Sequence, residues 1–312
     1  MSRIAFGTWQ LGGDWGSFDE DTAIAAIHHA RELGVTLFDT AQAYGFGKSE
    51  AMLGKALREE LKRDRDNLVI ATKGGIKPRS ERPRDSRREW LTQGIEDSLR
   101  FLDVDHIDLY QIHWPDSDAP AEETAGILQE FVDAGKIRHV GVSNYDAAGL
   151  AAFDKTRPVE TLQPPYHLFR RDIETDPLPY ARENDIGVLV YSPLGSGLLT
   201  GAFTPETTFE KTDWRSRSSA FTGETFQRNL AVVDRLKEFA AGKGISVSQL
   251  AIAWTLAQPG VHVAIVGARK AANIEASLAA ADIDLTADEL AEIDRLTADA
   301  VPVAGASPEG VA

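Results

Sequence analysis

The chain has 312 residues, of which 43% are hydrophobic and 26% charged, as in an ordinary globular protein. Its formal net charge of −15 disfavours nucleic acid and anionic membranes as partners, because both would be repelled. The absence of cysteine excludes disulfides and thiolate catalysis. With no apolar run of about 18 residues and no secretory pattern at the start, we expect a cytoplasmic protein. Nothing in the sequence indicates an oligomeric state.

Short β-rich runs alternate with amphipathic segments along the chain. The eight runs are residues 3–8, 35–40, 67–73, 107–113, 137–143, 159–163, 186–192 and 262–268. Between the first two, Ile24, Ile27 and Leu33 recur at helical spacing before Gly34, which suits a helix end. This alternation predicts either a closed (β/α)8 barrel or a doubly wound sheet, and the count of eight favours the barrel.

The alternation is interrupted after the seventh run. Residues 194–224 form a long loop with little periodicity, and loops of that length are usually functional or disordered. Two helices then follow in succession, at 227–244 and 246–258, and a last helix begins at the N-cap residue Thr286. The linker-like composition of 300–312 predicts a flexible tail. We expect one domain over residues 1–312.

One short motif suggests a nucleotide site and fails a closer test. Gly47, Lys48 and Ser49 end the stretch 41–50 as a Walker phosphate loop ends. Such a loop needs a glycine five positions before Gly47, where this chain has Gln42. We therefore predict that Lys48 is a surface charge and that the stretch serves another chemistry.

Polar residues end three of the predicted strands. These are Asp39, Lys73 and His113, and Tyr44 follows Asp39 by five residues. In a parallel barrel such positions meet at one mouth. A neighbouring ammonium lowers the pKa of a tyrosine, which would make Tyr44 an acid that can protonate a carbonyl oxygen. Each residue alone has a structural explanation as a cap, a solvated charge or a core side chain, so the combination carries the prediction.

The motifs around these residues resemble those of the aldo-keto reductases. They are "FDTAQAYGFGKSE" (38–50), "IATKGG" (70–75), "DLYQIHWPD" (108–116), "GVSNY" (141–145), "YSPLGSGLL" (191–199) and "VGARKAANIEAS" (266–277). The resemblance covers nearly the whole chain and is closest to bacterial members with a His-Trp-Pro-Asp sequence. It implies a (β/α)8 barrel and NADPH-dependent reduction of an aldehyde or ketone. It also implies a catalytic tetrad of Asp39, Tyr44, Lys73 and His113, with Tyr44 as general acid.

The resemblance further implies which residues hold NADPH or NADP+, since no G-x-G-x-x-G fingerprint is present. Ser143, Asn144 and Gln163 would bind the nicotinamide carboxamide, and Tyr191 would stack on its ring. The remaining implied contacts are Gly7, Thr8, Trp9 and Asp39 at the first strand ends, the pyrophosphate loop Ser192, Pro193, Leu194, Gly195, Ser196 and Gly197, the long-loop cations Lys211, Arg215 and Arg217, and Gly267, Ala268, Arg269 and Asn273 at the 2′-phosphate end. We expect residues 200–222 of the long loop, which have few apolar anchors, to be mobile without cofactor and at least partly ordered with it.

Two positions depart from the family pattern. Ala276 and Ser277 stand where the family usually has Glu-Asn facing the adenine. Because "IAFGTW" matches the first strand almost at once, we expect the β-hairpin that usually precedes this strand to be missing. The substrate pocket is expected to include Trp9, Tyr44, His113 and Trp114, with no metal.

Two other functions remain open at this point. Some family members are regulatory subunits of ion channels that keep the cofactor and the tetrad but turn over little. A (β/α)8 isomerase or aldolase could instead use Lys73 as a Schiff base, although the Tyr-Lys-Asp arrangement and the lack of a phosphate motif disfavour it.

Overall fold

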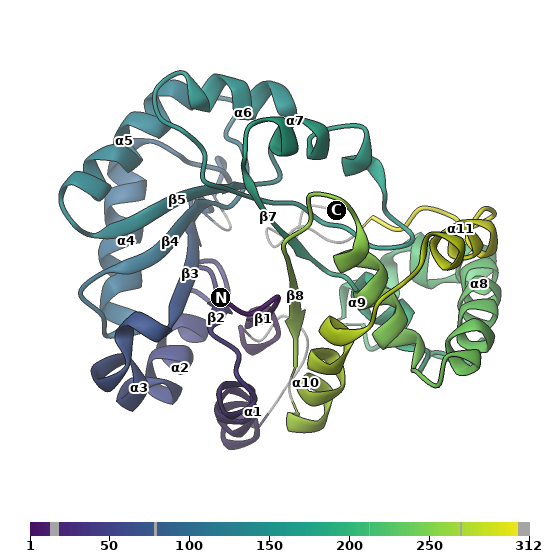
Figure 1. Cartoon of the computed structure of the whole chain (residues 1–312). Coiled ribbons are helices and arrows are strands. Elements are labelled where there is room, and N and C mark those ends of the chain that lie inside the picture. The colour runs from purple at the N-terminus through teal and green to yellow at the C-terminus, as the bar shows by residue number, and fades with distance from the viewer. Residues whose placement is uncertain (13–18, 78–79, 212, 269, 305–312) are drawn as a thin grey trace.

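The structure is a computed structural model that describes residues 1–12, 19–77, 80–211, 213–268 and 270–304. Within these ranges eight parallel strands close a barrel in chain order, and the last strand pairs with the first (Figure 1). The strands are β1 (Ile4–Gly7), β2 (Leu37–Asp39), β3 (Val69–Gly74), β4 (Ile107–Ile112), β5 (Ile137–Ser143), β6 (Thr161–Gln163), β7 (Gly187–Tyr191) and β8 (Val263–Gly267). Seven strands lie within runs predicted from the sequence, and β3 extends one residue beyond its run, to Gly74. Closure confirms the barrel rather than the doubly wound sheet.

Alternation along the strands places every second side chain inside the barrel. An inner apolar layer fills the lower part, formed by Ala5, Leu37, Ala71, Leu109, Leu189, Val263 and Ile265. Above it the register aligns polar residues across neighbouring strands: Lys73 pairs with Gln111, and Ser143 pairs with Gln163. The carboxyl ends of the strands therefore carry a polar layer on an apolar floor.

Helices cover the outside of this barrel (Figure 1). They are α1 (Glu20–Glu32), α2 (Lys48–Ala56), α3 (Arg58–Arg63), α4 (Arg88–Leu102), α5 (Ala121–Asp133), α6 (Ala147–Asp154), α7 (Leu178–Glu183) and α10 (Ala271–Leu278). Gly34 turns the chain after α1 with a φ of +91°, as predicted. Leu33, expected on the buried stripe, is instead exposed, because it lies at the C-cap where the helix has already ended. None of the described helices combines the length and apolar character that spanning a bilayer requires.

The additional helices predicted near the C-terminus are confirmed. Among the described residues, α8 (Gly223–Gly242) and α9 (Val247–Ala257) lie between β7 and β8, and α11 (Ala287–Leu296) packs beside α8 (Figure 1). Thr286 caps α11 through a capping box with Glu289. This cap and the capping box of Ser246 on α9 fix where both helices begin.

The prediction of a flexible tail over residues 300–312 is wrong for Val301 and Val303, which are held in place. The side chain of Asn229 on α8 bonds both the N–H and the carbonyl of Val301, at 2.9 and 3.0 Å. Val303 is buried, and its N–H donates to the carbonyl of Phe169 at 2.9 Å. These bonds involve the backbone of Val301 and Val303, so the side-chain pattern of the sequence does not reveal them. Residues 305–312 lie outside the described residues.

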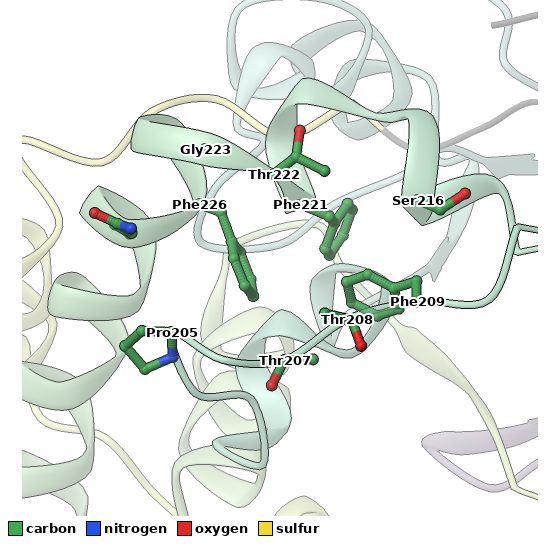
Figure 2. Close-up of a pocket in the computed structure, with 10 residues that line it drawn as sticks. Pro205, Thr207, Thr208, Phe209, Ser216, Phe221, Thr222, Gly223 and Phe226 are labelled. Atoms are coloured by element: carbon green, nitrogen blue, oxygen red, sulfur yellow. The ribbon is translucent and has the colours of Figure 1, made fainter.

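The long segment after β7 holds an aromatic cluster, made of Phe203, Phe209, Phe221 and Phe226, with ring centroids 5.4 to 6.5 Å apart. Three of these rings line a pocket of about 310 Å³ between the segment and the start of α8 (Figure 2). The expectation of few apolar anchors is therefore wrong. The phenylalanines are irregularly spaced because short 3-10 turns, at Trp214–Arg217 and Ser219–Phe221, carry the chain between them.

Candidate active site

A cavity of about 560 Å³ opens at the carboxyl ends of the strands. Most of the predicted site residues line it, contributed by strand ends, the loop after β7 and α10: Gly7, Trp9, Asp39, Tyr44, His113, Trp114, Ser143, Asn144, Gln163, Tyr191, Ser192, Pro193, Leu194, Ser196, Gly197, Gly267 and Asn273. The strand-end argument therefore brings the expected side chains to one place.

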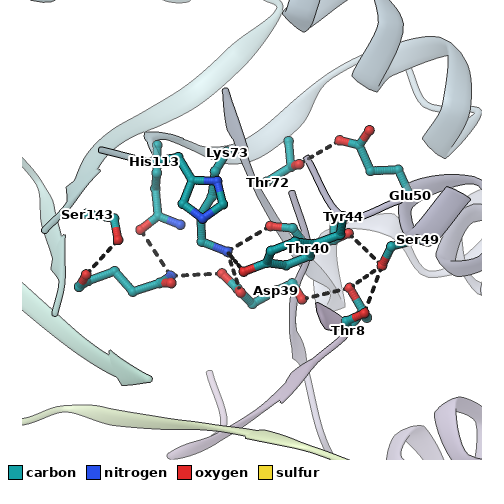
Figure 3. Close-up of polar contacts among 12 residues, drawn as sticks. Thr8, Asp39, Thr40, Tyr44, Ser49, Glu50, Thr72, Lys73, His113 and Ser143 are labelled. Atoms are coloured by element: carbon teal, nitrogen blue, oxygen red, sulfur yellow. Dashed lines mark hydrogen bonds and ion pairs between the residues drawn. The ribbon is translucent and has the colours of Figure 1, made fainter. Parts of the chain in front are cut away.

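The ammonium of Lys73 joins the predicted tetrad. Its Nζ donates to Asp39 Oδ1 at 2.6 Å, to the Thr40 carbonyl at 2.9 Å and to the Tyr44 hydroxyl at 3.3 Å (Figure 3). The ring of His113 meets that of Tyr44 edge-on, with centroids 5.6 Å apart. Lys73 itself lies behind the cavity wall, where it contacts two residues that line the cavity, Asp39 and Tyr44.

Burial sets the charges of this group. Desolvation lowers the pKa of Lys73, while the adjacent Asp39 raises it and so offsets part of the shift. The pKa of His113 lies well below its ordinary value, because the imidazole is fully buried and faces the field of Lys73. His113 is consequently neutral and keeps one N–H donor and one acceptor.

The loop after β2 explains how Tyr44 is held. Gly45 and Gly47 adopt left-handed backbone, with φ of +63° and +86°, and a side chain on Gly45 would collide with the Gly12 carbonyl at 2.3 Å. Ser49 in the first turn of α2 donates to Thr8 across the loop (Figure 3). Thus the Gly-Lys-Ser sequence closes the tyrosine loop and begins a helix, and Lys48 is exposed as predicted.

The three residues expected at the carboxamide are linked by hydrogen bonds. Asn144, in left-handed backbone at φ +62°, accepts from the Tyr191 hydroxyl at 2.8 Å and donates to the His113 carbonyl at 3.0 Å. Asn144 also donates to Ser143 Oγ, which donates to the Gln163 carbonyl at 2.7 Å. The Gln163 amide donates to Asp39 Oδ2 at 2.8 Å. A preorganised network therefore runs from Tyr191 to the tetrad.

The turn after β7 is built for close approach of a ligand to the backbone. Ser192, Ser196 and Gly197 take positive φ values of +56°, +55° and +100°. Arg215 lines the same end of the cavity, donates to the Ser196 carbonyl at 3.1 Å and stacks 4.5 Å from the Phe209 ring centroid. Its guanidinium is also held by Asp213. The long segment is thereby fastened to the turn.

Some predicted contacts do not reach the cavity surface. Lys211 and Arg217 are exposed and do not line it, because the 3-10 turn directs Arg215 inward instead. Thr8, Gly195 and Ala268 are buried behind the wall, where Thr8 bonds the Asp39 carbonyl at 3.1 Å. Arg269, expected at the 2′-phosphate, lies outside the described residues.

Several lining residues were not predicted as contacts: Gln10, Thr200, Ala202, Ser248, Ile265 and Val266. Ala276 and Ser277, noted above at the positions that face the adenine in the family, also line the cavity. Gln10 lies directly over Gly267, where a side chain would approach its amide to 2.6 Å. Its position just after Trp9 at the end of β1 was the available signal. Ser248 comes from the first turn of α9, which only tertiary packing brings to this site.

Comparison with known proteins agrees with this geometry. The profile of the aldo/keto reductase family matches residues 3–298. The aldo-keto reductase YhdN of Bacillus subtilis is 45% identical over 278 residues, which cover 88% of this chain and 83% of that protein. A glycerol dehydrogenase from Gluconobacter oxydans superposes with a TM-score of 0.88 at 41% identity, covering 97% of this chain and 93% of the other.

A second solved structure is an aldo/keto reductase from Klebsiella pneumoniae in complex with NADP and acetate. It superposes with a TM-score of 0.73 at 30% identity, covering 95% of this chain and 91% of the other. The profile match and the identities over nearly the full length lead to one assignment: the chain belongs to the aldo/keto reductase family.

Proposed function

We propose that the protein reduces an aldehyde or ketone to an alcohol with NADPH, using Tyr44 as general acid. The observation that carries this proposal is the position of Lys73 Nζ, 2.6 Å from Asp39 Oδ1 and 3.3 Å from the Tyr44 hydroxyl at the cavity wall. An ammonium this close favours the phenolate that remains after a proton leaves Tyr44. A cytoplasmic location, expected from the sequence, is part of the proposal.

The residues around the cavity fit the cofactor. Asn144 and Gln163 offer amide groups to a carboxamide, and Tyr191 offers an aromatic face. Positive-φ backbone at Ser196 and the guanidinium of Arg215 suit phosphate oxygens. When bound, the reduced cofactor supplies the hydride that the carbonyl carbon receives. The names of the Klebsiella and Gluconobacter proteins, an NADP complex and a glycerol dehydrogenase, support the same reaction class.

Three side chains of the protein then act at the carbonyl oxygen, either directly or through a neighbour. The neutral imidazole of His113 donates a hydrogen bond that orients the carbonyl toward Tyr44. Tyr44 transfers its hydroxyl proton to that oxygen as negative charge develops there. Lys73, held by Asp39, stabilises the tyrosinate, which later regains a proton from solvent. Trp9 and Trp114 wall the substrate end and exclude water.

Two alternatives are weaker. A Schiff-base mechanism needs a free neutral amine, whereas Lys73 donates to three oxygens and is 1% exposed. A regulatory protein with little turnover would keep the same tetrad, so the geometry does not separate it from an enzyme, but the names of the similar proteins, a reductase and a dehydrogenase, favour turnover. Because one similar structure is a glycerol dehydrogenase, the first substrates to test are small hydroxylated carbonyl compounds such as glyceraldehyde and dihydroxyacetone.

Substituting Tyr44→Phe tests the proposal. The ring is kept and the proton donor is lost, so kcat for carbonyl reduction should fall by about 10²- to 10⁴-fold. The Kd for NADPH, measured by fluorescence titration, should stay at the wild-type value. Wild-type turnover in the variant would remove Tyr44 from the mechanism.

A further inference from the structure

Gln111 is a buried polar residue outside the tetrad. It lies on β4 in register with Lys73 on one side and with Gly141 on the other. Its side chain points into the barrel, since it lies two residues after Leu109, which belongs to the inner layer, and so shares its face of the strand. A Cβ on Gly141 would lie 3.0 Å from Gln111 Cγ, so the glutamine rests on bare backbone and is 0% exposed. Its position is therefore fixed by the strands around it.

Stability does not explain a glutamine here. Within the described residues its Nε2 is buried and has no hydrogen-bond partner. A buried N–H without a partner costs free energy, and an apolar side chain of similar volume would avoid this cost. We therefore look for the role of this glutamine in its amide oxygen, Oε1.

That atom meets the amide of Gln163. Gln163 Nε2 donates to Asp39 Oδ2 at 2.8 Å and to Gln111 Oε1 at 3.3 Å. Because a carboxylate only accepts hydrogen bonds, the nitrogen of Gln163 must face Asp39. Both hydrogens of this amide are then used, one by the aspartate and one by Gln111.

Only the oxygen of the Gln163 amide is left for a ligand. Gln163 lines the cavity, and in the part of the chain that the structure describes its Oε1 accepts no hydrogen bond. The oxygen can accept from an NH2 group but has nothing to offer a carbonyl. Rotation of the amide would place its oxygen against both Asp39 and the oxygen of Gln111, which opposes the flip.

We propose that Gln111 is a positioning residue that holds the Gln163 amide with its oxygen toward the cofactor, so that the site reads the NH2 group of the nicotinamide carboxamide. The inference rests on the proposed function, since it requires NADP(H) in this cavity. It assigns to Gln111 a part in cofactor selection without contact between Gln111 and the cofactor.

The test compares NADP+ with its 3-acetylpyridine analogue, in which a methyl group replaces the amide NH2. A site that binds an NH2 group discriminates against a ligand without one. In Gln111→Leu, and in the unbranched Gln111→Met, the Kd for NADP+ should rise by about two- to tenfold, the range expected for one hydrogen bond. The Kd for the analogue should change little, so the ratio of the two values should shrink. The Tm should stay near that of the wild type, because the unpartnered amide nitrogen of Gln111 is removed while one N–H of Gln163 loses its acceptor.

Thr161→Val is the matched control. Thr161 Oγ1 also lies against Gly141 and is buried without a partner among the described residues, and the bonds of the Gln163 amide go to Asp39 and Gln111 rather than to Thr161. This variant should keep both Kd values. Wild-type Kd values and ratio in both Gln111 variants would overturn the inference, as would equal losses for the two ligands with a lowered Tm, which indicate a structural role. A wild-type protein that binds no NADP+ would instead refute the proposed function.

Discussion

The charge of Lys73 is the property on which the proposed acidity of Tyr44 depends. Burial lowers the pKa of Lys73, and Asp39 counteracts that shift through its charge and its hydrogen bond. The ammonium is present below this pKa and is lost as the pH rises through it. Carbonyl reduction should therefore decline at alkaline pH, before an exposed lysine would lose its proton.

Substituting Asp39→Asn should move that decline to lower pH, because the remaining influence on Lys73 is dominated by desolvation. The measurement is the pH profile of kcat/KM for the carbonyl substrate. Asp116→Asn is the control, since Asp116 is similarly buried near the mouth but binds Arg82 rather than Lys73. An alkaline limb that stays in place in the Asp39 variant would contradict the assigned role of Asp39.

Single residues could be predicted where a strand end fixed their direction. Asp39 and His113 end strands that were plain in the sequence, and the family resemblance gave their roles. Lys211 and Arg217 were misplaced, because an irregular turn has no period from which side-chain direction follows. Gln111 was overlooked although it lies two residues after Leu109 and two before His113, a spacing that places its polar side chain on the same inward face.

At the scale of elements, the segment between β7 and α8 depends on its aromatic cluster. Phe221 is 1% exposed and contacts Phe203, Phe209 and Trp214. Phe209 in turn supports the guanidinium of Arg215 over the cavity. The cluster therefore connects the core to the cofactor end of the site.

We expect Phe221→Ala to loosen this segment and weaken NADPH binding. Truncating a buried phenylalanine typically costs about 3–5 kcal/mol, and the loss should appear as faster hydrogen exchange over residues 203–221. The control Phe131→Ala removes a buried ring on α5, away from the cavity, and should leave exchange in the segment and the Kd for NADPH unchanged. Unchanged exchange in the Phe221 variant would mean that the cluster does not hold the segment.

The helices and strands could be predicted because their hydrophobic residues recur with a clear period, whereas the contacts of this segment could not. Strand runs and amphipathic helices gave all eight strands and the paired helices α8 and α9. The aromatic anchors follow no helical or strand spacing, and the bonds that fix Val301 use its backbone alone. Neither kind of contact leaves a periodic signal in the sequence.

At the scale of the whole molecule, the alternation of strands and helices is compatible with two folds, a closed barrel and a doubly wound sheet. Only the pairing of β1 with β8 closes the ring and brings the first and last strand ends to one mouth. Gly7 and Gly267 meet there in register, beside Asp39. We infer that the chain is one domain, since α11 and Val303 pack against the same core.

We propose that this protein, with NADPH in its cavity, reduces a carbonyl compound in repeated turnovers. The most direct measurement uses NADPH deuterated at C4 of the nicotinamide with glyceraldehyde, dihydroxyacetone and a panel of further aldehydes, ketones and sugars. We predict oxidation of many cofactor equivalents per protein molecule and deuterium on the carbinol carbon of the product. NADPH that binds tightly but is not oxidised by any member of the panel would contradict the proposed carbonyl reduction.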